Sequence, residues 1–268
     1  AIPRLSYRIE SVAELAEHFV MWEYATAMCG YLLKVCPFDQ PDVASTKAAA
    51  LKILEEGQPA PDFEEPFIGH VHMGEAEVTM APCVKADTLM DALYRLFSSV
   101  QPGDYFALNA FLPFDGEGRR EALETIRHGV ADKLGVASCL EIGPRYLHST
   151  GQLHKGGPNK GVFLLISADE LKDIPLSNVE AESLGTLAKA QAAADLSILI
   201  DRGRRCMHLH LPDNSGVTIR ALGDAVMRVL YRIDAETFTV EKQFKFKLGD
   251  WPSEVQLNGD GTKLYWLN

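Results

Sequence analysis

The chain lacks an excess of positive charge, a long apolar run and paired cysteines. Its 268 residues carry a formal net charge of -11, and an acidic surface of this kind repels nucleic acid and anionic membranes. We therefore expect no nucleic-acid partner and no membrane partner. No apolar run approaches the roughly 18 residues that a transmembrane helix requires, and the first residues contain no apolar segment of signal-peptide length.

The five cysteines are scattered and odd in number, and no Cys-x-x-Cys motif occurs. This arrangement indicates reduced thiols rather than a disulfide framework, so we expect a cytoplasmic protein. Two pairs, His70 with His72 and His208 with His210, would each place both imidazoles on one face of a strand, as a metal site could require. Because no Asp, Glu or Cys stands at a suggestive spacing from either pair, we expect no metal and no cofactor.

The first hundred residues have the pattern of a helical segment. Apolar spacing predicts helices over 11–35, where Ser11 can cap the first turn with Glu14 three residues later, over 42–56, and within 85–100. Residues 57–83 are rich in proline, glycine and acidic side chains, which favours a loop with at most a short strand.

From residue 103 strands alternate with helices. The pattern predicts strands at 105–112, 136–142, 162–167 and 206–211, and helices at 117–134, 183–202 and 218–229. Such alternation is typical of an α/β domain, here residues 101–230, whose parallel sheet is flanked by helices on both faces. Residues 231–268 instead alternate apolar and polar side chains, and Asn-Gly-Asp-Gly at 258–261 is a hairpin signal. They predict a short antiparallel β tail.

Polar side chains gather in residues 143–161, between two apolar runs that we expect to be strands. Ligands of parallel sheets collect outside the carboxyl ends of the strands, which is where this stretch begins. His148 could move protons there near neutral pH, or it could be a loop histidine that only hydrogen-bonds its neighbours. The six-residue separation from His154 argues against a zinc pair on one helix face.

A second polar pair lies at the start of the helix predicted for 42–56. Gln40 and Lys47 are seven residues apart, so they would lie on the same side of the helix, about two turns apart. A glutamine and a lysine at a helix N-terminus suit sugar hydroxyls and an anion, although a solvated helix start would carry the same residues. The run Glu-Ser-Leu-Gly-Thr at 182–186 places a carboxylate near a small-residue turn, but Ser183 fits better as a helix cap.

Two longer motifs resemble those of a known family. "PFDQPDVASTK", residues 37–47, resembles the C-terminal signature of phosphoglucose isomerases, and "LHSTGQLHKGG", residues 147–157, resembles the histidine motif of the bacterial isomerases. With their flanks, the two motifs resemble the C-terminal part of bifunctional transaldolase/glucose-6-phosphate isomerases over roughly residues 10–228. The resemblance implies a sugar isomerase (SIS) type α/β fold and the interconversion of glucose 6-phosphate and fructose 6-phosphate.

The resemblance also implies roles for individual residues. It assigns opening of the sugar ring to His148, with Lys47 sharing that work near the ring oxygen, and it places Gln40 near the phosphate and sugar oxygens. The remaining motif residues are expected to contact the substrate: Arg145, Gln152, His154 and Lys155. The chemistry is consistent, because isomerisation needs an acid at the ring oxygen, a base between C1 and C2, and positive charge near the enediolate.

The sequence also departs from the family pattern. The family's base is a glutamate in an upstream Glu-Ser-x-Gly-Lys motif that this sequence does not contain, and the first SIS half and the transaldolase domain are also missing. We therefore expect an incomplete active site that is inactive alone and is completed by the missing half or by a homo-oligomer. The alternative is a non-catalytic SIS-like module for sugar-phosphate binding or assembly. The tail resembles one blade edge of a β-propeller, which leaves open a third role in protein interaction.

Overall fold

The computed structural model describes most of the chain, in two compact units, residues 1–233 and 234–268. The described residues are 6–56, 67–71, 74–113, 116, 118–169, 173–177, 183–237, 254–257 and 264–267. Within these ranges, no helix combines the length and the hydrophobicity of a membrane-spanning segment.

The first unit is built around a six-stranded sheet with the order β1-β2-β6-β5-β3-β4. Its four parallel strands confirm the α/β class: β3 (Tyr105–Phe111), β4 (Ala137–Ile142), β5 (Gly161–Ala168) and β6 (Arg205–Leu211). All eight residues of β5 are buried, as expected of a central strand covered on both faces.

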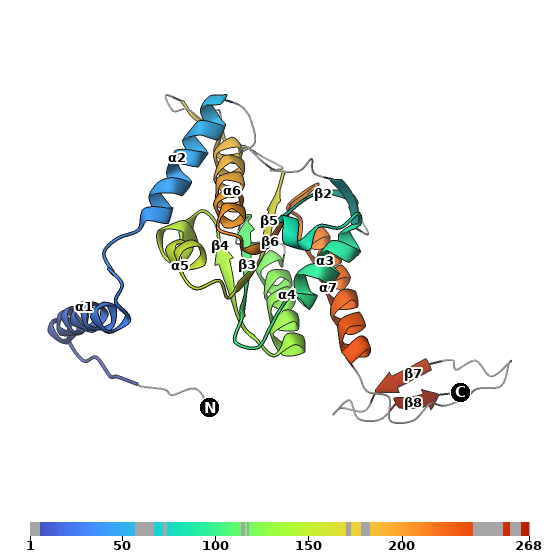
Figure 1. Cartoon of the computed structure of the whole chain (residues 1–268), viewed down its shortest axis with the longest axis horizontal. Coiled ribbons are helices and arrows are strands. Elements are labelled where there is room, and N and C mark those ends of the chain that lie inside the picture. The colour runs from blue at the N-terminus through green and yellow to red at the C-terminus, as the bar shows by residue number, and fades with distance from the viewer. Residues whose placement is uncertain are drawn as a thin grey trace. The chain divides into compact units, whose positions relative to one another are not determined.

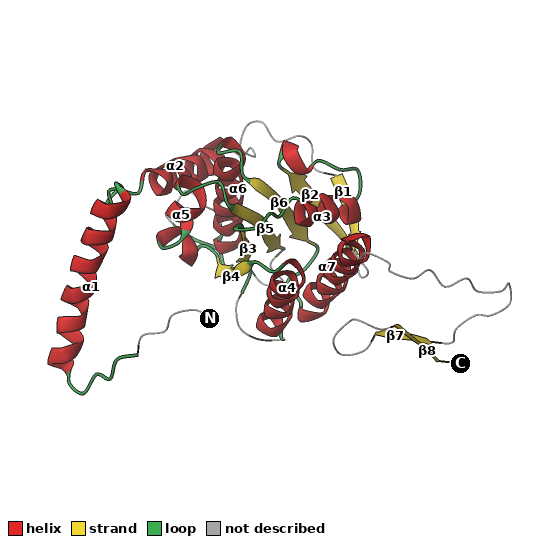
Figure 2. Ribbon diagram, turned by 60° about the horizontal axis from the view of Figure 1, so that its bottom comes forward, coloured by secondary structure: helices red, strands yellow, loops and turns green. Residues whose placement is uncertain are grey.

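Helices cover both faces of this sheet (Figure 1, Figure 2). One face carries α3 (Leu89–Ser98), α4 (Arg119–Leu134) and α7 (Gly216–Thr237), and the other carries α5 (Gly151–Gly156) and α6 (Leu184–Asp201). A further helix, α2 (Pro41–Glu56), packs against both α5 and α6. The segment that carries the isomerase-like signature is therefore attached to the helical layer over one face of the sheet.

The helix expected at 11–35 is α1 (Val12–Leu33). Ser11 caps it as predicted, because its side-chain oxygen accepts a hydrogen bond of 3.2 Å from the backbone N–H of Glu14. The helix ends at Lys34, whose φ of 56° is left-handed. Large apolar side chains are exposed along it, including Trp22 with 56% of its surface accessible.

A β-hairpin corrects the expectation of a helical segment over residues 1–100, in which 57–83 was expected to be a loop with a short strand. Strands β1 (Phe67–Val71) and β2 (Gly74–Met80) pair antiparallel, and β2 continues the sheet by pairing antiparallel with β6. Ala76 and Val78 are buried while Glu77 between them is exposed, which is the period-two pattern of a half-buried strand. The sheet is consequently mixed rather than wholly parallel.

The polar stretch 143–161 also differs from the expected strand–loop–strand crossing. It contains the 3-10 helix η2 (Arg145–His148) and the short helix α5. Another 3-10 helix, η1 (Pro82–Val84), precedes α3. Two helical turns at the carboxyl end of β4 hold polar side chains in fixed directions, which a loop alone would not do.

The second unit contains an antiparallel pair, β7 (Glu254–Leu257) and β8 (Leu264–Leu267), in a sheet of its own. This confirms antiparallel structure separate from the parallel strands for these residues. The expected start of the tail at residue 231 is too early, because α7 continues to Thr237. The other apolar–polar alternations of the tail and the turn at 258–261 lie outside the described residues.

Candidate functional site

The two motifs recognised in the sequence meet through one pair of side chains. Asp42, in the first turn of α2, is buried, and its backbone N–H donates a 3.0 Å hydrogen bond to Oε1 of Gln152 in α5. In return, Nε2 of Gln152 donates a 2.7 Å bond to Oδ2 of Asp42. The amide of Gln152 thus satisfies one donor and one acceptor at the start of α2, and it fixes this helix end against α5.

The same aspartate contacts α6 and lies close to Gly156, the last residue of α5. Its second oxygen, Oδ1, accepts a 2.6 Å hydrogen bond from Nη2 of Arg202, just beyond the last residue of α6. A Cβ atom added at Gly156 would lie 2.7 Å from Oδ2 of Asp42. Because that distance is too short for a carbon–oxygen contact, a larger residue at position 156 would force the Asp42 carboxylate, and with it the pairing to Gln152, to move.

Four of the predicted site residues are exposed: Gln40, Lys47, Arg145 and His148. Gln40 directly precedes α2, and its carbonyl accepts backbone hydrogen bonds from Val43 and Ala44 in the first turn. His148 is the last residue of η2, four positions before Gln152. The pairing of Asp42 with Gln152 therefore brings together the two segments that carry these exposed groups.

Lys155 faces the protein interior. Its ammonium forms an ion pair with Asp195 of α6, and both side chains are only 1% exposed. The hydroxyl of Tyr146 donates to the other carboxylate oxygen of Asp195. Burial, reinforced by the negative charge of Asp195, raises the pKa of Tyr146 well above its usual value. This arrangement is a buried structural network that ties α5 and η2 to α6.

His154 is also inside the protein, with 3% of its surface exposed. Its ring lies 5.2 Å from that of Phe163 and 5.9 Å from that of Tyr146, measured between centroids. Burial lowers the pKa of His154 to about 4, and the positive charges of Lys155 and Arg204 act in the same direction. The imidazole is therefore neutral at pH 7 and supplies no positive charge to an anionic substrate.

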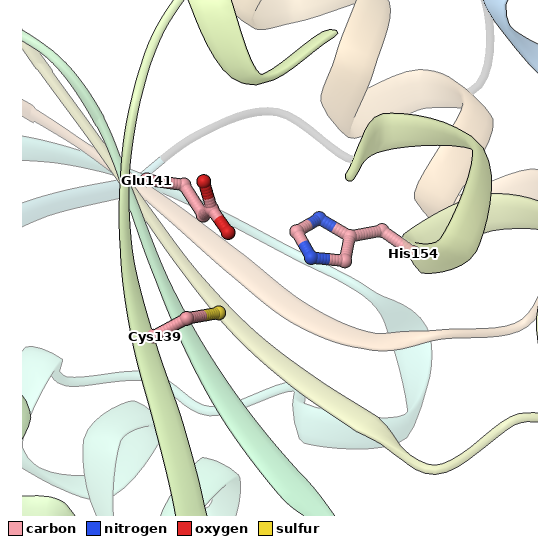
Figure 3. A group of neighbouring side chains, drawn as sticks. All are labelled: Cys139, Glu141 and His154. Carbon is pink, nitrogen blue, oxygen red and sulfur yellow. The ribbon is translucent and has the colours of Figure 1, made fainter. Parts of the chain in front are cut away.

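Facing His154 is a group that our sequence reasoning did not find (Figure 3). Cys139 and Glu141 of β4 and His154 of α5 can place one thiol, one carboxylate and one imidazole donor within 4.8 Å of one another. Burial, with Glu141 acting in the same direction, raises the pKa of Cys139 to about 12, so its thiol is protonated at pH 7. The signal available in the sequence was a Cys-x-Glu pair on a strand, whereas we considered only histidine pairs as possible metal ligands.

The His-x-His pair on β6, His208 and His210, is hydrogen-bonded to Ser167 of β5. Oγ of Ser167 lies 2.7 Å from Nε2 of His208 and 2.8 Å from Nδ1 of His210. Nε2 of His210 is 3.3 Å from the carboxylate of Asp169. These contacts account for both imidazoles by hydrogen bonding. His72 of the other pair lies outside the described residues.

The start of α6 confirms the interpretation of Ser183 as a helix cap. Its side-chain oxygen accepts a 3.0 Å hydrogen bond from the backbone N–H of Thr186. The carboxylate of Asp173 accepts a further 2.8 Å bond from the N–H of Gly185, so an anion from the chain itself already occupies this helix N-terminus. Glu182 lies outside the described residues.

Comparison with known proteins gives one partial sequence match. No protein-family model matches the chain. A glucose-6-phosphate isomerase of Mycoplasmopsis pulmonis (strain UAB CTIP) is 44% identical over 57 residues, which are 20% of this chain and 13% of that protein. The structure of a hypothetical protein of Thermus thermophilus aligns with a TM-score of 0.46 and 20% identity, over 53% of this chain and 38% of the other. The chain thus has a partial similarity to glucose-6-phosphate isomerase, and the match spans 13% of that relative.

Proposed function

We propose that this chain supplies part of the active site of an aldose–ketose isomerase acting on glucose 6-phosphate and fructose 6-phosphate. The observation that carries the proposal is the reciprocal pairing of Asp42 with Gln152, which joins the two isomerase-like motifs in one structure. The partial similarity to a glucose-6-phosphate isomerase supports the same substrate class. We place this sugar-phosphate chemistry in the cytoplasm.

The exposed motif residues are the ones to which we assign substrate contacts. His148 and Lys47 assist ring opening by moving a proton at the ring oxygen, and the amide of Gln40 binds sugar or phosphate oxygens. Arg145 adds positive charge on the same short helix as His148, where it can stabilise negative charge on the substrate or on the enediolate.

The inner motif residues have a different role in this proposal. The amide of Gln152 is already hydrogen-bonded to Asp42. Lys155 is ion-paired with Asp195, and His154 is neutral and buried. We assign these three side chains to positioning the motif rather than to binding the substrate. Their role is to hold the helices that present Lys47 and His148.

The active site as proposed is incomplete in this chain. The sequence does not contain the upstream glutamate motif that serves as base in the resembling family, and the α6 N-terminus is filled by Asp173. A general base typically contributes about 10²–10⁴-fold to the rate, so we expect the isolated chain to show little turnover. A missing upstream isomerase half, or a second copy of the chain, would have to complete the site.

A non-catalytic module for sugar-phosphate binding or assembly is the second candidate. The exposed apolar side chains of α1, such as Trp22 and Leu32, favour an assembly role, because large exposed apolar surfaces commonly mark protein interfaces. Binding and turnover distinguish the two candidates.

The test combines calorimetric binding of glucose 6-phosphate with a coupled assay for fructose 6-phosphate, with and without an upstream isomerase fragment. We expect turnover only with the fragment, and we expect Lys47→Ala and His148→Ala each to lower kcat by about 10²-fold or more. Lys52→Ala, an exposed lysine on the same helix, is the matched control and should leave kcat unchanged. Binding without turnover in any combination would select the non-catalytic sugar-phosphate module. Absence of binding in every combination would reject both sugar-phosphate roles and leave the assembly role.

A further inference from the structure

We propose that Cys139, Glu141 and His154 form a binding site for one divalent transition-metal ion of the zinc type. Their side chains converge from two elements of the fold, β4 and α5 (Figure 3), and their donor atoms lie within 4.8 Å of one another. This inference is independent of the isomerase proposal, and it revises our expectation from the sequence that no metal site is present.

The backbone places the ligands where a metal needs them. Cys139 and Glu141 are two residues apart on β4, so both side chains leave the same face of the strand. The imidazole of His154 points from α5 toward these two side chains (Figure 3). Two donors from a strand therefore face one donor from a helix, which would supply three of the four ligands of a tetrahedral site.

The imidazole is a ready ligand. His154 is buried, and its Nδ1 atom has no hydrogen-bond partner among the described residues. A buried nitrogen without a partner is unusual, because buried polar atoms are almost always hydrogen-bonded.

The side chains of Cys139 and Glu141 supply the negative charge and the sulfur and oxygen donors that a zinc-type ion needs. The thiol of Cys139 makes a weak contact with the backbone, with Sγ 3.9 Å from the carbonyl oxygen of Phe106, and it interacts with the side chain of Glu141. When the Sγ–metal bond forms, the thiol proton leaves to solvent, and the resulting thiolate and the Glu141 carboxylate together balance a 2+ ion. Calcium and magnesium prefer oxygen ligands alone, whereas a mixed sulfur, nitrogen and oxygen set suits zinc.

The separation of the donors is compatible with such an ion after small side-chain rotations. Metal–ligand bonds of about 2.0–2.3 Å hold tetrahedral donors roughly 3.3–3.6 Å apart. The donor atoms, which lie up to 4.8 Å apart, would therefore have to move closer to one another by about an ångström. Three protein ligands leave one position for water, as in open zinc sites.

The test uses the full-length chain with the exposed cysteines Cys29, Cys36 and Cys83 replaced by serine, so that they do not compete for metal. After removal of bound metal with a chelator, the protein is titrated with Co²⁺, whose thiolate complexes absorb in the near ultraviolet through sulfur-to-metal charge transfer. We expect the band to saturate at one Co²⁺ per chain and to be abolished by Zn²⁺, which displaces the Co²⁺.

Variants assign the ligands. Cys139→Ser should abolish the charge-transfer band, and Glu141→Gln and His154→Gln should each weaken Zn²⁺ binding by more than the ~10–100-fold typical of losing an outer-shell contact. His128→Gln, an exposed imidazole on α4, is the matched control and should leave the affinity unchanged.

Protection of Cys139 from alkylation can be measured on the unsubstituted chain, so this test does not depend on the folding of any variant. Zn²⁺ should slow alkylation of Cys139, measured by mass spectrometry, without changing that of the buried Cys206. A missing charge-transfer band, a band that survives Cys139→Ser, or alkylation of Cys139 that is unaffected by Zn²⁺ would overturn the metal site.

Discussion

Replacing Lys155 with methionine tests whether this motif residue is structural. The substitution removes the ammonium and keeps an unbranched apolar side chain, so the main change is the loss of the positive charge beside Asp195. Both partners are 1% exposed, and the carboxylate would remain inside the protein with the hydroxyl of Tyr146 as its donor among the described residues. Breaking a buried ion pair from one side typically costs about 3–5 kcal/mol.

The cost of protonating Asp195 in the variant is of a similar size. The stranded Asp195 can avoid a buried negative charge by binding a proton. At pH 7 this costs about 4 kcal/mol for a carboxyl group with an ordinary pKa near 3.9, at about 1.36 kcal/mol per pH unit. We therefore expect Lys155→Met to lower the free energy of unfolding by about 3–5 kcal/mol at pH 7.

The loss of unfolding free energy in Lys155→Met should depend on pH through the protonation of Asp195. In the variant, the folded-state pKa of Asp195 is raised above its unfolded value, so the folded chain binds the proton first as the pH falls. The penalty should be full above the raised folded-state pKa, and it should shrink as the pH falls from there toward about 4. Urea unfolding of both proteins at pH 7 and pH 5 measures this difference.

Two controls complete the experiment. The triple variant Lys155→Met/Asp195→Leu/Tyr146→Phe removes the ion pair together with the hydroxyl that donates to it, so it should recover most of the lost stability. Lys160→Met removes an ammonium that is 53% exposed and 3.6 Å from Asp104, and it should cost no more than about 1 kcal/mol. A loss below about 1 kcal/mol for Lys155→Met, or a loss independent of pH, would refute the assignment of Lys155 to the core.

Two further predictions concern acid stability and the tail. Burial lowers the pKa of the partly buried His208 to about 3, so below about pH 6.5 the unfolded chain takes up a proton that the folded chain does not. His208 should lower the unfolding free energy by up to about 2 kcal/mol from pH 6.5 to pH 5. His208→Gln should remove that part of the slope and leave the part due to His154; an unchanged slope would contradict the cause. Deleting residues 234–268, the second compact unit, should leave a cooperative melt of the α/β body, and a broad, non-cooperative melt would show that the tail belongs to the core.

Local patterns were sufficient for most elements of the fold. The apolar run at 162–167 and the amphipathic spacing within 85–100 correctly predicted β5 and α3, because each pattern reports which face of its own element is buried. The hairpin of β1 and β2 was missed because its pairing partner, β6, lies more than a hundred residues away. Proline, glycine and acidic residues around the hairpin gave its sequence the composition of a loop.

At the candidate site too, the sequence predicted some features and not others. The motifs identified the segments of interest, but they did not separate exposed from buried side chains. Gln152, His154 and Lys155 belong to one short polar run, yet successive helix positions point in different directions, and each of the three meets a different element. The burial of Lys155 could not be read from the sequence, because its counter-charge, Asp195, lies forty residues further along the chain.

These contacts explain why a six-residue helix exists here at all. Isolated helices shorter than about 12–15 residues are marginal in water, so α5 depends on its tertiary contacts: Gln152 with α2, Lys155 with α6, and His154 packed against the sheet. The polar character of this stretch therefore serves the junction of three elements as well as any substrate. Because the start of α2 is fixed through Gln152, loosening α5 should displace the helix that presents Lys47 before it unfolds the sheet. We expect Lys155→Met to speed backbone hydrogen exchange in the first turns of α2, and unchanged exchange there would show that α6 alone holds this helix.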